Sequence, residues 1–282
     1  MREALFYQKL NGGFVQCGLC PHLCRIAKDK TGICKVRKNN GGVLTTESYG
    51  RISGLSLDPI EKKPLKMFYP KSFILSVGSY GCNMKCAYCQ NHSISQSIPQ
   101  TRFILPEELL AIAKSEPDNL GIAFTYNEPL ISIEYILDTA PLFKSVGLKT
   151  VLVTNGMINI EPLKALLPYI DAMNIDFKAF DTEKYKSLKG DLAAVMKTVE
   201  ESSKACHVEI TSLIVPGQND TEKDIISLSD WLKGISPKIP LHITRFYPRY
   251  KFSNYESTPK ETLEKLAALA LKKLKYVYLG NI

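Results

Sequence analysis

Three cysteines spaced C-x-x-x-C-x-x-C are the residues of this chain best suited to carry chemistry. Cys82, Cys86 and Cys89 follow the apolar run 72–78, which predicts a buried strand, and Gly81 allows a sharp bend between this strand and the cysteines. Thiolates are the usual protein ligands of iron–sulfur clusters. A cluster of four irons that is held by only three thiolates keeps one iron open, and an open iron can chelate a small molecule.

The same cysteines have a second interpretation. Together with His92 they would supply four ligands, which make a complete tetrahedral zinc site of the structural kind. The cysteine spacing alone leaves both interpretations open. Polar residues that recur at the ends of predicted strands later in the chain favour the open iron–sulfur cluster.

Four further cysteines lie near the start of the chain. Cys17, Cys20, Cys24 and Cys34 are spaced C-x-x-C-x-x-x-C-x9-C, and their four thiolates predict a second metal site. Zinc and an auxiliary iron–sulfur cluster use the same ligands, so the spacing does not separate them. We expect the nearby His22 to lie beside this site rather than to bind the metal.

Composition and charge limit the class of protein. The 282 residues are 45% hydrophobic and 23% charged, which is ordinary for a globular protein. The chain shows no signal segment and no apolar run of the roughly 20 residues that a membrane helix needs. We therefore expect a cytoplasmic protein with no membrane association. Thiols stay reduced in that compartment, so its eight cysteines indicate metal binding or catalysis before disulfides.

The formal net charge of +8 comes mainly from three basic stretches, 25–38, 61–71 and 272–275. Such stretches are usually solvated surfaces, and an acidic protein partner or an anionic substrate would suit them equally well. No DNA or RNA recognition motif accompanies them, so a nucleic-acid partner is not expected.

Strands and helices are predicted to alternate from residue 72 onward. The apolar, β-branched runs predict strands at 72–78, 121–125, 149–154, 172–178, 207–214, 241–246 and 276–279. Amphipathic stretches predict helices at 106–116, 132–146, 161–168, 182–204 with a break near Gly190, 221–234 with a capping box of Thr221 and Asp224, and 259–274.

Repeated strand–helix units predict an α/β fold with a parallel sheet and right-handed crossovers. Six or seven units suggest a partial (β/α)6 TIM-like barrel rather than a full barrel of eight. We expect two regions. Residues 1–70 would form a cysteine-rich extension and linker, and residues 71–282 would form the barrel.

In such barrels the active site lies at the carboxyl ends of the strands, and polar residues are predicted there. The candidates are Asn127 and Glu128 after the second strand, Thr154 and Asn155 after the third, Asp176 and Lys178 on the fourth, and Thr211 and Ser212 on the fifth. Structural alternatives remain open for the first three pairs. A turn explains the first two pairs, and an ion pair explains the third.

For the other polar residues the sequence predicts no role in binding a metal or a cofactor. Buried structural roles are expected for Cys206, His207 and His242. Arg245, Tyr247 and Arg249 follow the sixth strand, where they would either contact a substrate carboxylate or remain solvated.

With Tyr88 in the aromatic place, C-x-x-x-C-x-aromatic-C resembles the signature of radical S-adenosylmethionine (radical SAM) enzymes. The resemblance extends along nearly the whole chain. Segments 17–24, 58–65, 125–129, 153–156 and 276–281 look like the AmmeMemoRadiSam system radical SAM family, which is similar to pyruvate formate-lyase activating enzymes. Many members of that family continue into a tail with another cysteine pair, so any function of such a tail is in doubt here.

The resemblance implies a radical SAM barrel and an oxidoreductase- or activase-like activity. In that family pattern, Cys82, Cys86 and Cys89 hold a [4Fe-4S] cluster whose fourth iron is chelated by S-adenosylmethionine. One electron then cleaves the cofactor into methionine and a 5′-deoxyadenosyl radical, which abstracts hydrogen from a substrate. Asn127 and Glu128 would take the place of the segment that grips the cofactor's amino group.

The remaining contacts follow the same pattern. Thr154 and Asn155 would bind a carboxylate or the ribose, Asp176 and Lys178 would lie beside the methionyl end, and Thr211 or Ser212 would reach the ribose. A reductant such as flavodoxin or ferredoxin is implied, together with AMMECR-type and Memo-type proteins as partners. The substrate is not identified.

Two alternative functions remain. One is a glycyl-radical-enzyme activase like the pyruvate formate-lyase activating enzymes, with a glycine of a partner protein as its target. The other is a non-catalytic adaptor that binds zinc at both cysteine groups.

Overall fold

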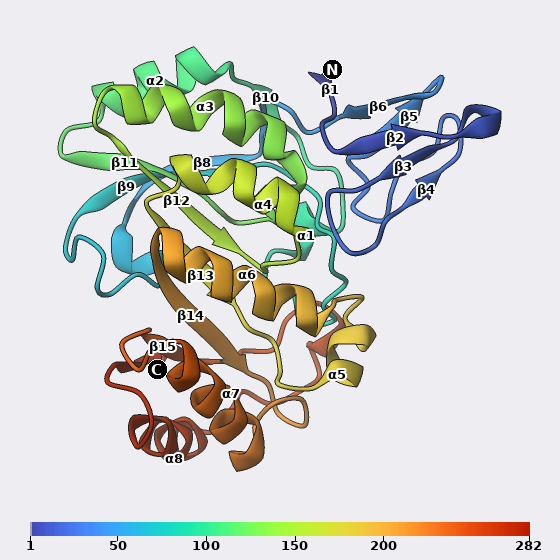
Figure 1. The fold of residues 1–282 in the computed structure, drawn as a ribbon. Helices are drawn as coiled ribbons and strands as arrows, with labels where there is room; N and C mark the ends of the chain where they lie inside the picture. The colour runs from blue at the N-terminus through green and yellow to red at the C-terminus, as the bar shows by residue number, and fades with distance from the viewer. Residues whose placement is uncertain (1) are drawn as a thin grey trace.

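The computed structural model describes residues 2–282; Met1, the first residue of the predicted extension, lies outside the described part. An open sheet of eight strands forms its centre (Figure 1), in the order β16-β15-β14-β13-β12-β11-β9-β8. Its strands are β8 (Gly54–Pro59), β9 (Phe73–Gly78), β11 (Asn119–Phe124), β12 (Lys149–Thr154), β13 (Ala172–Asp176), β14 (His207–Ile214), β15 (Leu241–Arg245) and β16 (Val277–Gly280).

Every neighbouring pair in this sheet is parallel except β8 with β9, which is antiparallel. The predicted α/β fold with a parallel sheet is therefore confirmed, and the strands have nearly their predicted bounds. The sheet remains open between β8 and β16, as expected of a partial barrel. β8 was not predicted. Residues 54–59 were expected to belong to the linker, whereas they form an edge strand of the central sheet.

Helices follow the parallel strands and cover the outer face of the sheet (Figure 1). The helices are α1 (His92–Ser95), α2 (Pro106–Ser115), α3 (Ile133–Ser145), α4 (Ile160–Leu166), α5 (Thr182–Ser187), α6 (Leu192–Ala205), α7 (Glu222–Ile235) and α8 (Lys260–Leu271). The capping residue predicted for α7 is confirmed, because the Thr221 hydroxyl accepts the Asp224 N–H at 3.2 Å.

The predicted break in the helix near Gly190 is also present, between α5 and α6. The packing explains why glycine stands there. A Cβ atom at residue 190 would lie 2.7 Å from Met84 Cε and 2.8 Å from Tyr185 Cδ1. The close approach brings the α5–α6 turn against the cysteine loop, and the Lys85 N–H donates to the Leu188 carbonyl at 2.8 Å.

The N-terminal extension is built from small antiparallel sheets. One has the order β1-β6-β5, another has the order β2-β3-β4, and β7 pairs with β10 in a two-stranded ribbon. The bounds of these strands are β1 (Arg2–Glu3), β2 (Tyr7–Lys9), β3 (Val15–Cys17), β4 (Arg25–Ile26), β5 (Arg37–Asn40), β6 (Val43–Thr46), β7 (Arg51–Ile52) and β10 (Arg102–Phe103).

The extension lies beside the barrel, near the carboxyl ends of several of its strands (Figure 1). Backbone contacts fix it there. The Asn159 N–H, just before α4, donates to the Leu19 carbonyl at 3.0 Å, and the Leu5 N–H donates to the Glu134 carboxylate of α3 at 2.7 Å.

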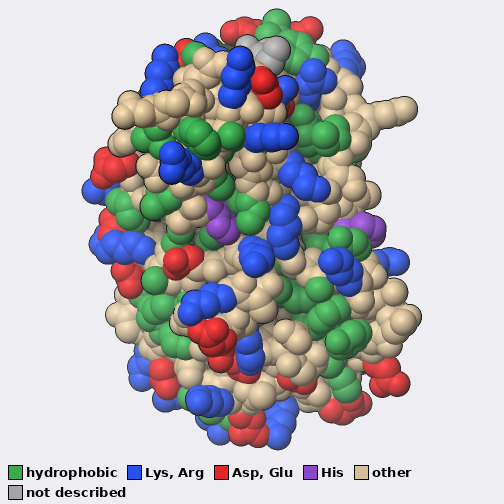
Figure 2. Space-filling view, turned by 90° about the vertical axis from the view of Figure 1, so that its right-hand side faces the viewer, with side chains coloured by type: hydrophobic (Ala, Val, Ile, Leu, Met, Phe, Trp, Pro, Cys, Tyr) green, Lys and Arg blue, Asp and Glu red, His purple; other side chains and the backbone are tan. Residues whose placement is uncertain are grey.

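The core is formed by near-continuous apolar strands that are buried on both faces, as expected of a covered parallel sheet. Basic side chains are distributed over the surface. On the face shown in Figure 2, Lys and Arg side chains alternate with hydrophobic and acidic ones. None of the helices in residues 2–282 has the length and apolar character that crossing a bilayer requires.

Candidate active site

The cysteine loop leaves the carboxyl end of β9 at a glycine that no other residue can replace without strain. Gly81 has a φ of +86°, and a Cβ there would lie 2.7 Å from Val36 Cγ1 and 2.8 Å from the Cys34 carbonyl oxygen. Its N–H donates to the Ile94 carbonyl at 2.8 Å. The loop is therefore turned sharply and packed directly on the N-terminal extension.

The three thiols of this loop lie close enough to influence one another electrostatically. Burial raises the pKa of Cys82, and the Glu128 carboxylate and the Cys86 and Cys89 thiolates raise it further. Burial likewise raises the pKa of Cys86 to about 11, opposed by the ammonium of Lys178. Three thiolates at this site therefore need a bound cation, and soft thiolates suit iron and zinc.

Neighbouring groups are already directed at two of these sulfurs. The Met84 N–H donates to Cys82 Sγ at 3.3 Å, and the Asn155 side-chain amide lies 3.6 Å from the same sulfur. The Ser95 hydroxyl lies 3.1 Å from Cys89 Sγ. Hydrogen bonds to ligand sulfurs stabilise the thiolate form and orient the ligands around a metal. The three thiols thus fit the ligand set of an iron–sulfur cluster.

His92, the fourth ligand of the zinc interpretation, is engaged by another aromatic ring. It stacks on Tyr250 with the ring centroids 4.6 Å apart and the planes 15° apart. The segment that carries Tyr250 also covers the loop, because the Lys251 N–H donates to the Ala87 carbonyl at 3.0 Å. Among residues 2–282, no three Cys, His, Asp or Glu side chains form a group that could hold a single ion.

Asn127 and Glu128 lie at the end of β11 and join the cysteine loop to β12. The Asn127 side chain accepts the Ser79 N–H at 2.9 Å and donates to the Gly81 carbonyl at 3.2 Å. Glu128 is 3% exposed, and burial raises its pKa to about 7 although three neutral donors favour the anion. Both side chains are therefore already bonded to the protein.

Thr154 and Asn155, at the end of β12, supply two of those three donors. The Thr154 hydroxyl donates to Glu128 Oε1 at 2.7 Å, and the Asn155 N–H donates to Oε2 at 2.8 Å. The Asn155 side-chain amide also donates to Asn83 Oδ1 at 2.9 Å. Asn83 lies between the first two cysteines, so this network positions the loop.

Asp176 and Lys178 form an ion pair at 3.1 Å, at and just past the end of β13. Burial alone would lower the pKa of Lys178, but the charges of Asp176 and Cys86 outweigh it and raise the pKa. Burial also raises the pKa of the neighbouring Tyr88, whose ring packs 5.8 Å from that of Phe252. The structure therefore brings Lys178, Asp176 and Tyr88 together around Cys86.

Thr211 and Ser212 are adjacent on β14 and so face opposite sides of the sheet. The Thr211 hydroxyl donates to Asn174 Oδ1 at 2.9 Å, on the side that also carries Asp176. Ser212 faces outward, where it lines a small cavity with Ile225 and Leu228 of α7. Of the two, only Thr211 lies on the barrel's inner side.

The four N-terminal cysteines share one cavity, although no three of them are arranged around a single ion. Cys17, Cys20, Cys24 and Cys34 line one small cavity together with Arg37. Burial raises the pKa of Cys20 to about 12, and the Cys17, Cys34 and Cys24 thiolates raise it further. His22 is placed beside this site, and its Nε2 lies 2.8 Å from the Asn83 carbonyl oxygen of the other cysteine loop.

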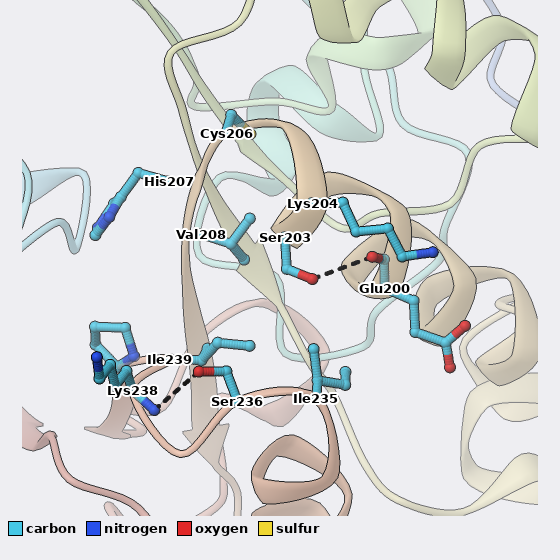
Figure 3. A pocket seen from close by; sticks show the side chains of 11 residues that line it. Glu200, Ser203, Lys204, Cys206, His207, Val208, Ile235, Ser236, Lys238 and Ile239 are labelled. Atoms are coloured by element: carbon cyan, nitrogen blue, oxygen red, sulfur yellow. Dashed lines mark hydrogen bonds between the residues drawn. The ribbon is translucent and has the colours of Figure 1, made fainter.

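A cavity of about 550 Å³ lies elsewhere (Figure 3). Its walls come from α6, the start of β14 and the segment between α7 and β15, and they include Cys206 and His207. These are the amino ends of the strands, opposite to the cysteine loop. The position of this cavity therefore argues against a role in chemistry at the loop.

A buried carboxylate near that end was not singled out from the sequence. Glu209 is 0% exposed, and its oxygens lie 2.9 Å from His207 Nε2 and 2.6 Å from His242 Nε2. The backbone N–H groups of Lys66 and Met67 also donate to it. His242 is buried as expected, whereas His207, with 30% of its side chain exposed, and Cys206 are only half-buried. The only signal in the sequence for Glu209 was a charged residue inside an apolar strand.

The polar group after β15 turns toward the chain terminus. Arg245 Nε donates to the Thr258 carbonyl at 2.7 Å, and its Nη1 lies 3.3 Å from the Tyr247 hydroxyl. Arg249 precedes the 3-10 turn Tyr250–Phe252 that covers the cysteine loop. Arg245 is therefore held by protein oxygens rather than left free for a carboxylate.

Comparison with known proteins adds to this geometry. A model of the Radical SAM superfamily matches residues 76–232. The chain is 42% identical to an uncharacterized protein of Methanocaldococcus jannaschii, an alignment that covers 100% of this chain and 86% of the relative. It is 25% identical to the pyruvate formate-lyase-activating enzyme of Clostridium pasteurianum over 66% of this chain and 85% of that enzyme.

Solved structures show the same fold. A domain of the pyruvate-formate lyase-activating enzyme from Bacteroides vulgatus matches with a TM-score of 0.50 and 17% identity, covering 57% of this chain and 99% of the domain. SuiB of Streptococcus suis matches with a TM-score of 0.55 and 14% identity, covering 73% of this chain and 48% of SuiB. At these identities the likeness concerns the fold.

Proposed function

Because the chain belongs to the radical SAM superfamily and is an enzyme, we propose that it cleaves S-adenosylmethionine reductively and uses the resulting radical on a substrate still to be identified. The observation that carries this proposal is the geometry of the cysteine loop. Cys82, Cys86 and Cys89 lie at the carboxyl edge of a parallel sheet, and three thiolates leave one position of a [4Fe-4S] cluster for the cofactor.

When bound, the cluster and S-adenosylmethionine supply a one-electron cleavage that gives methionine and a 5′-deoxyadenosyl radical. The protein's own residues hold and surround them. In this proposal Cys82, Cys86 and Cys89 bind three irons, and Asn155 and Met84 support the Cys82 sulfur. Tyr88 and the segment around Tyr250 exclude water from the loop.

The proposed contacts with S-adenosylmethionine follow from the residues around Cys86. We propose that the Lys178 ammonium binds the carboxylate of the methionyl end and that the Asp176 carboxylate binds its amino group, because each pair carries opposite charges. Thr211 on the inner side is the better placed of the two candidates for the ribose. Asn127, Glu128, Thr154 and Asn155 are proposed to act mainly by fixing the loop, since their polar atoms already bond to one another.

We also propose the family to which the chain belongs within the radical SAM superfamily. Membership of the AmmeMemoRadiSam family would make AMMECR-type and Memo-type proteins its partners and flavodoxin or ferredoxin its reductant, in the cytoplasm. Co-purification from cells that contain tagged candidates tests the partners. Zinc or a second iron–sulfur cluster on Cys17, Cys20, Cys24 and Cys34 belongs to the same proposal, supported by their shared cavity.

A second candidate function is activation of a glycyl-radical enzyme. It is supported by the likeness to the pyruvate formate-lyase-activating enzyme of Clostridium pasteurianum. Incubation of the reduced protein with S-adenosylmethionine and a candidate partner should then give the EPR doublet of a glycyl radical on that partner. A partner that stays EPR-silent while 5′-deoxyadenosine forms would leave cleavage intact and reject this candidate.

The central test is anaerobic reductive cleavage. Reconstituted protein with dithionite should convert S-adenosylmethionine to 5′-deoxyadenosine and methionine, and Cys86→Ala should not. Equal product from this variant and the parent would refute the cluster assignment. A colourless protein with about two zincs and no iron would instead support the zinc-binding adaptor.

A further inference from the structure

Arg37 is a buried cation with unused hydrogen-bond donors. It lies on β5, is 1% exposed, and pairs through Nη2 with Glu134 Oε1 and with the Leu5 carbonyl at 3.0 Å. Its Nε and Nη1 atoms have no hydrogen-bond partner among the described residues. A guanidinium carries five N–H donors, so three of them remain unsatisfied inside the protein. Native proteins rarely leave such groups unpaired.

Rearrangement of the ion pair does not remove this deficit. Glu134 Oε2 is also unpaired, and turning it toward Arg37 would satisfy one of the three N–H groups. Two donors would still remain. They belong to a side chain that lines the cavity of the four N-terminal cysteines, whose other walls are apolar, including Leu19, Ile26 and Ile131. The side-chain acceptors that line this cavity are the cysteine sulfurs, and none of them bonds to Arg37 Nε or Nη1 as the structure stands.

No three of these thiols are already arranged around an ion among the described residues. We propose that a bound metal draws Cys17, Cys20, Cys24 and Cys34 together from the walls of their shared cavity into a tetrathiolate centre, and that the Arg37 guanidinium is its side-chain N–H···S donor and counter-cation. Four thiolates around either a zinc ion or a [4Fe-4S] cluster carry net negative charge, which is costly to bury without donors and a nearby cation. Arg37 supplies both. This inference rests on the proposed second metal centre, and it does not depend on cleavage of S-adenosylmethionine.

The centre abuts the cysteine loop of the barrel. Residue 81 has no room for a side chain because the Cys34 carbonyl lies against it, and His22 contacts the Asn83 carbonyl. The Lys85 ammonium interacts electrostatically with the thiolates of both Cys82 and Cys34. A filled N-terminal centre therefore supports one wall of the loop.

The test uses the full chain with Cys82, Cys86 and Cys89 replaced by Ser, so that only the N-terminal site can bind. After removal of metal, this variant is incubated anaerobically with zinc alone or with ferrous iron and sulfide. One arm should retain about one zinc, or about four irons and four sulfides, per chain. Either result supports the centre, and the arms distinguish its two forms. Retention no greater than in a variant that also lacks Cys17, Cys20, Cys24 and Cys34 would overturn it.

Arg37 is then tested in the same background. Arg37→Met should lose metal to a competing chelator about tenfold more readily, because charge-assisted N–H···S bonds are lost. Arg37→Lys should recover part of this loss, and Glu134→Gln should remain near the parent. If circular dichroism shows that Arg37→Met does not fold, Arg37→Lys provides the test. Its sulfur-to-metal charge-transfer absorption is then compared with the parent's, with Co(II) in place of zinc in that arm. A purely structural role of Arg37 would not shift this absorption. Retention and spectrum equal to the parent's would refute the role of Arg37.

Because these measurements need no S-adenosylmethionine, failure here leaves the proposed cleavage untouched. Conversely, a protein that does not cleave S-adenosylmethionine can still hold the N-terminal centre. The two proposals therefore fail separately.

Discussion

Two buried glutamates at opposite ends of the same barrel have opposite electrostatic environments. At the carboxyl end, burial raises the pKa of Glu128 to about 7, and its hydrogen-bond donors are neutral. At the amino end, burial alone would raise the pKa of Glu209, but hydrogen bonds from His207, His242 and two backbone N–H groups lower it to about 2. Burial is similar at the two sites, so the partners decide the difference.

The two ends of the barrel therefore have different roles: the buried carboxylate at the amino end stabilises the fold, and the candidate active site lies at the carboxyl end. Glu209 is enclosed by two histidines and two backbone donors that leave no place for a ligand, so it ties the strands to the 66–67 segment. At the other end the thiols and the Lys178–Asp176 pair lie at the rim of the barrel. Glu209 is satisfied within the protein, whereas the thiols and the Lys178–Asp176 pair are the groups that we propose contact a cofactor.

The largest expected effect separates two cysteines. Cys86→Ala should reduce formation of 5′-deoxyadenosine to the level without protein, because one iron loses its thiolate. Cys206→Ala, at the amino end beside the large cavity, should retain full activity. Chromatographic measurement of 5′-deoxyadenosine under reducing, anaerobic conditions checks both variants. Similar losses in both would show that the two ends are not functionally distinct.

The second effect concerns acid stability at the amino end. The pKa of Glu209 is lowered to about 2 in the folded state, so its contribution is present above about pH 4.5 and is lost as pH falls toward 2. This contribution is about 3 kcal/mol by linkage. Glu209→Gln should be less stable at pH 7 and should lose little more in that acidic window.

Urea unfolding at several pH values measures this difference. Glu200→Gln, a partly exposed glutamate beside the same end, is the matched control and should behave as the parent does. A parallel loss of stability in the parent and in Glu209→Gln between pH 4.5 and 2 would contradict the assignment.

A third, smaller effect tests the ion pair at the carboxyl end. Lys178→Met should lower the rate of cleavage about tenfold, as expected when one charge-assisted contact to the cofactor is lost. Lys184→Met breaks a comparable ion pair, with Asp224 at 3.2 Å, away from the thiols. It should leave the rate unchanged. If both lysine variants cleave at the parent's rate, the pair of Lys178 and Asp176 is only structural.

The smallest effect compares the two ends of one strand, β12. Thr154→Val removes a hydroxyl that donates to Glu128 and should lower the free energy of unfolding by about 1 kcal/mol. Thr150→Val, at the amino end, removes a buried hydroxyl with no partner among the described residues. It should change stability by less than about 0.5 kcal/mol or increase it. Thermal unfolding of the two variants gives the comparison directly, and equal losses would remove the distinction.

Much of the fold was predictable because its signals are local. The parallel strands are short apolar runs, and the helix break near Gly190 and the Thr221 cap were visible as single residues. β8 was missed because residues 54–59 form an exposed edge strand whose sequence, with Asp58 and Pro59, reads as a loop. Its pairing with β9 is a tertiary choice that no local pattern encodes.

The sequence by itself determined the candidate ligands, which are seven cysteines in two groups, together with the glycine that bends the first loop and the order of strand ends around it. Only the tertiary structure decided which polar residues are free and which are occupied. It turned Ser212 outward, bonded Glu128 to Thr154 and Asn155, and placed Arg37, with its unpaired donors, in the wall of the cavity that the four N-terminal cysteines line. The physical reason is that hydrogen-bond partners far apart in sequence meet only after the chain has folded.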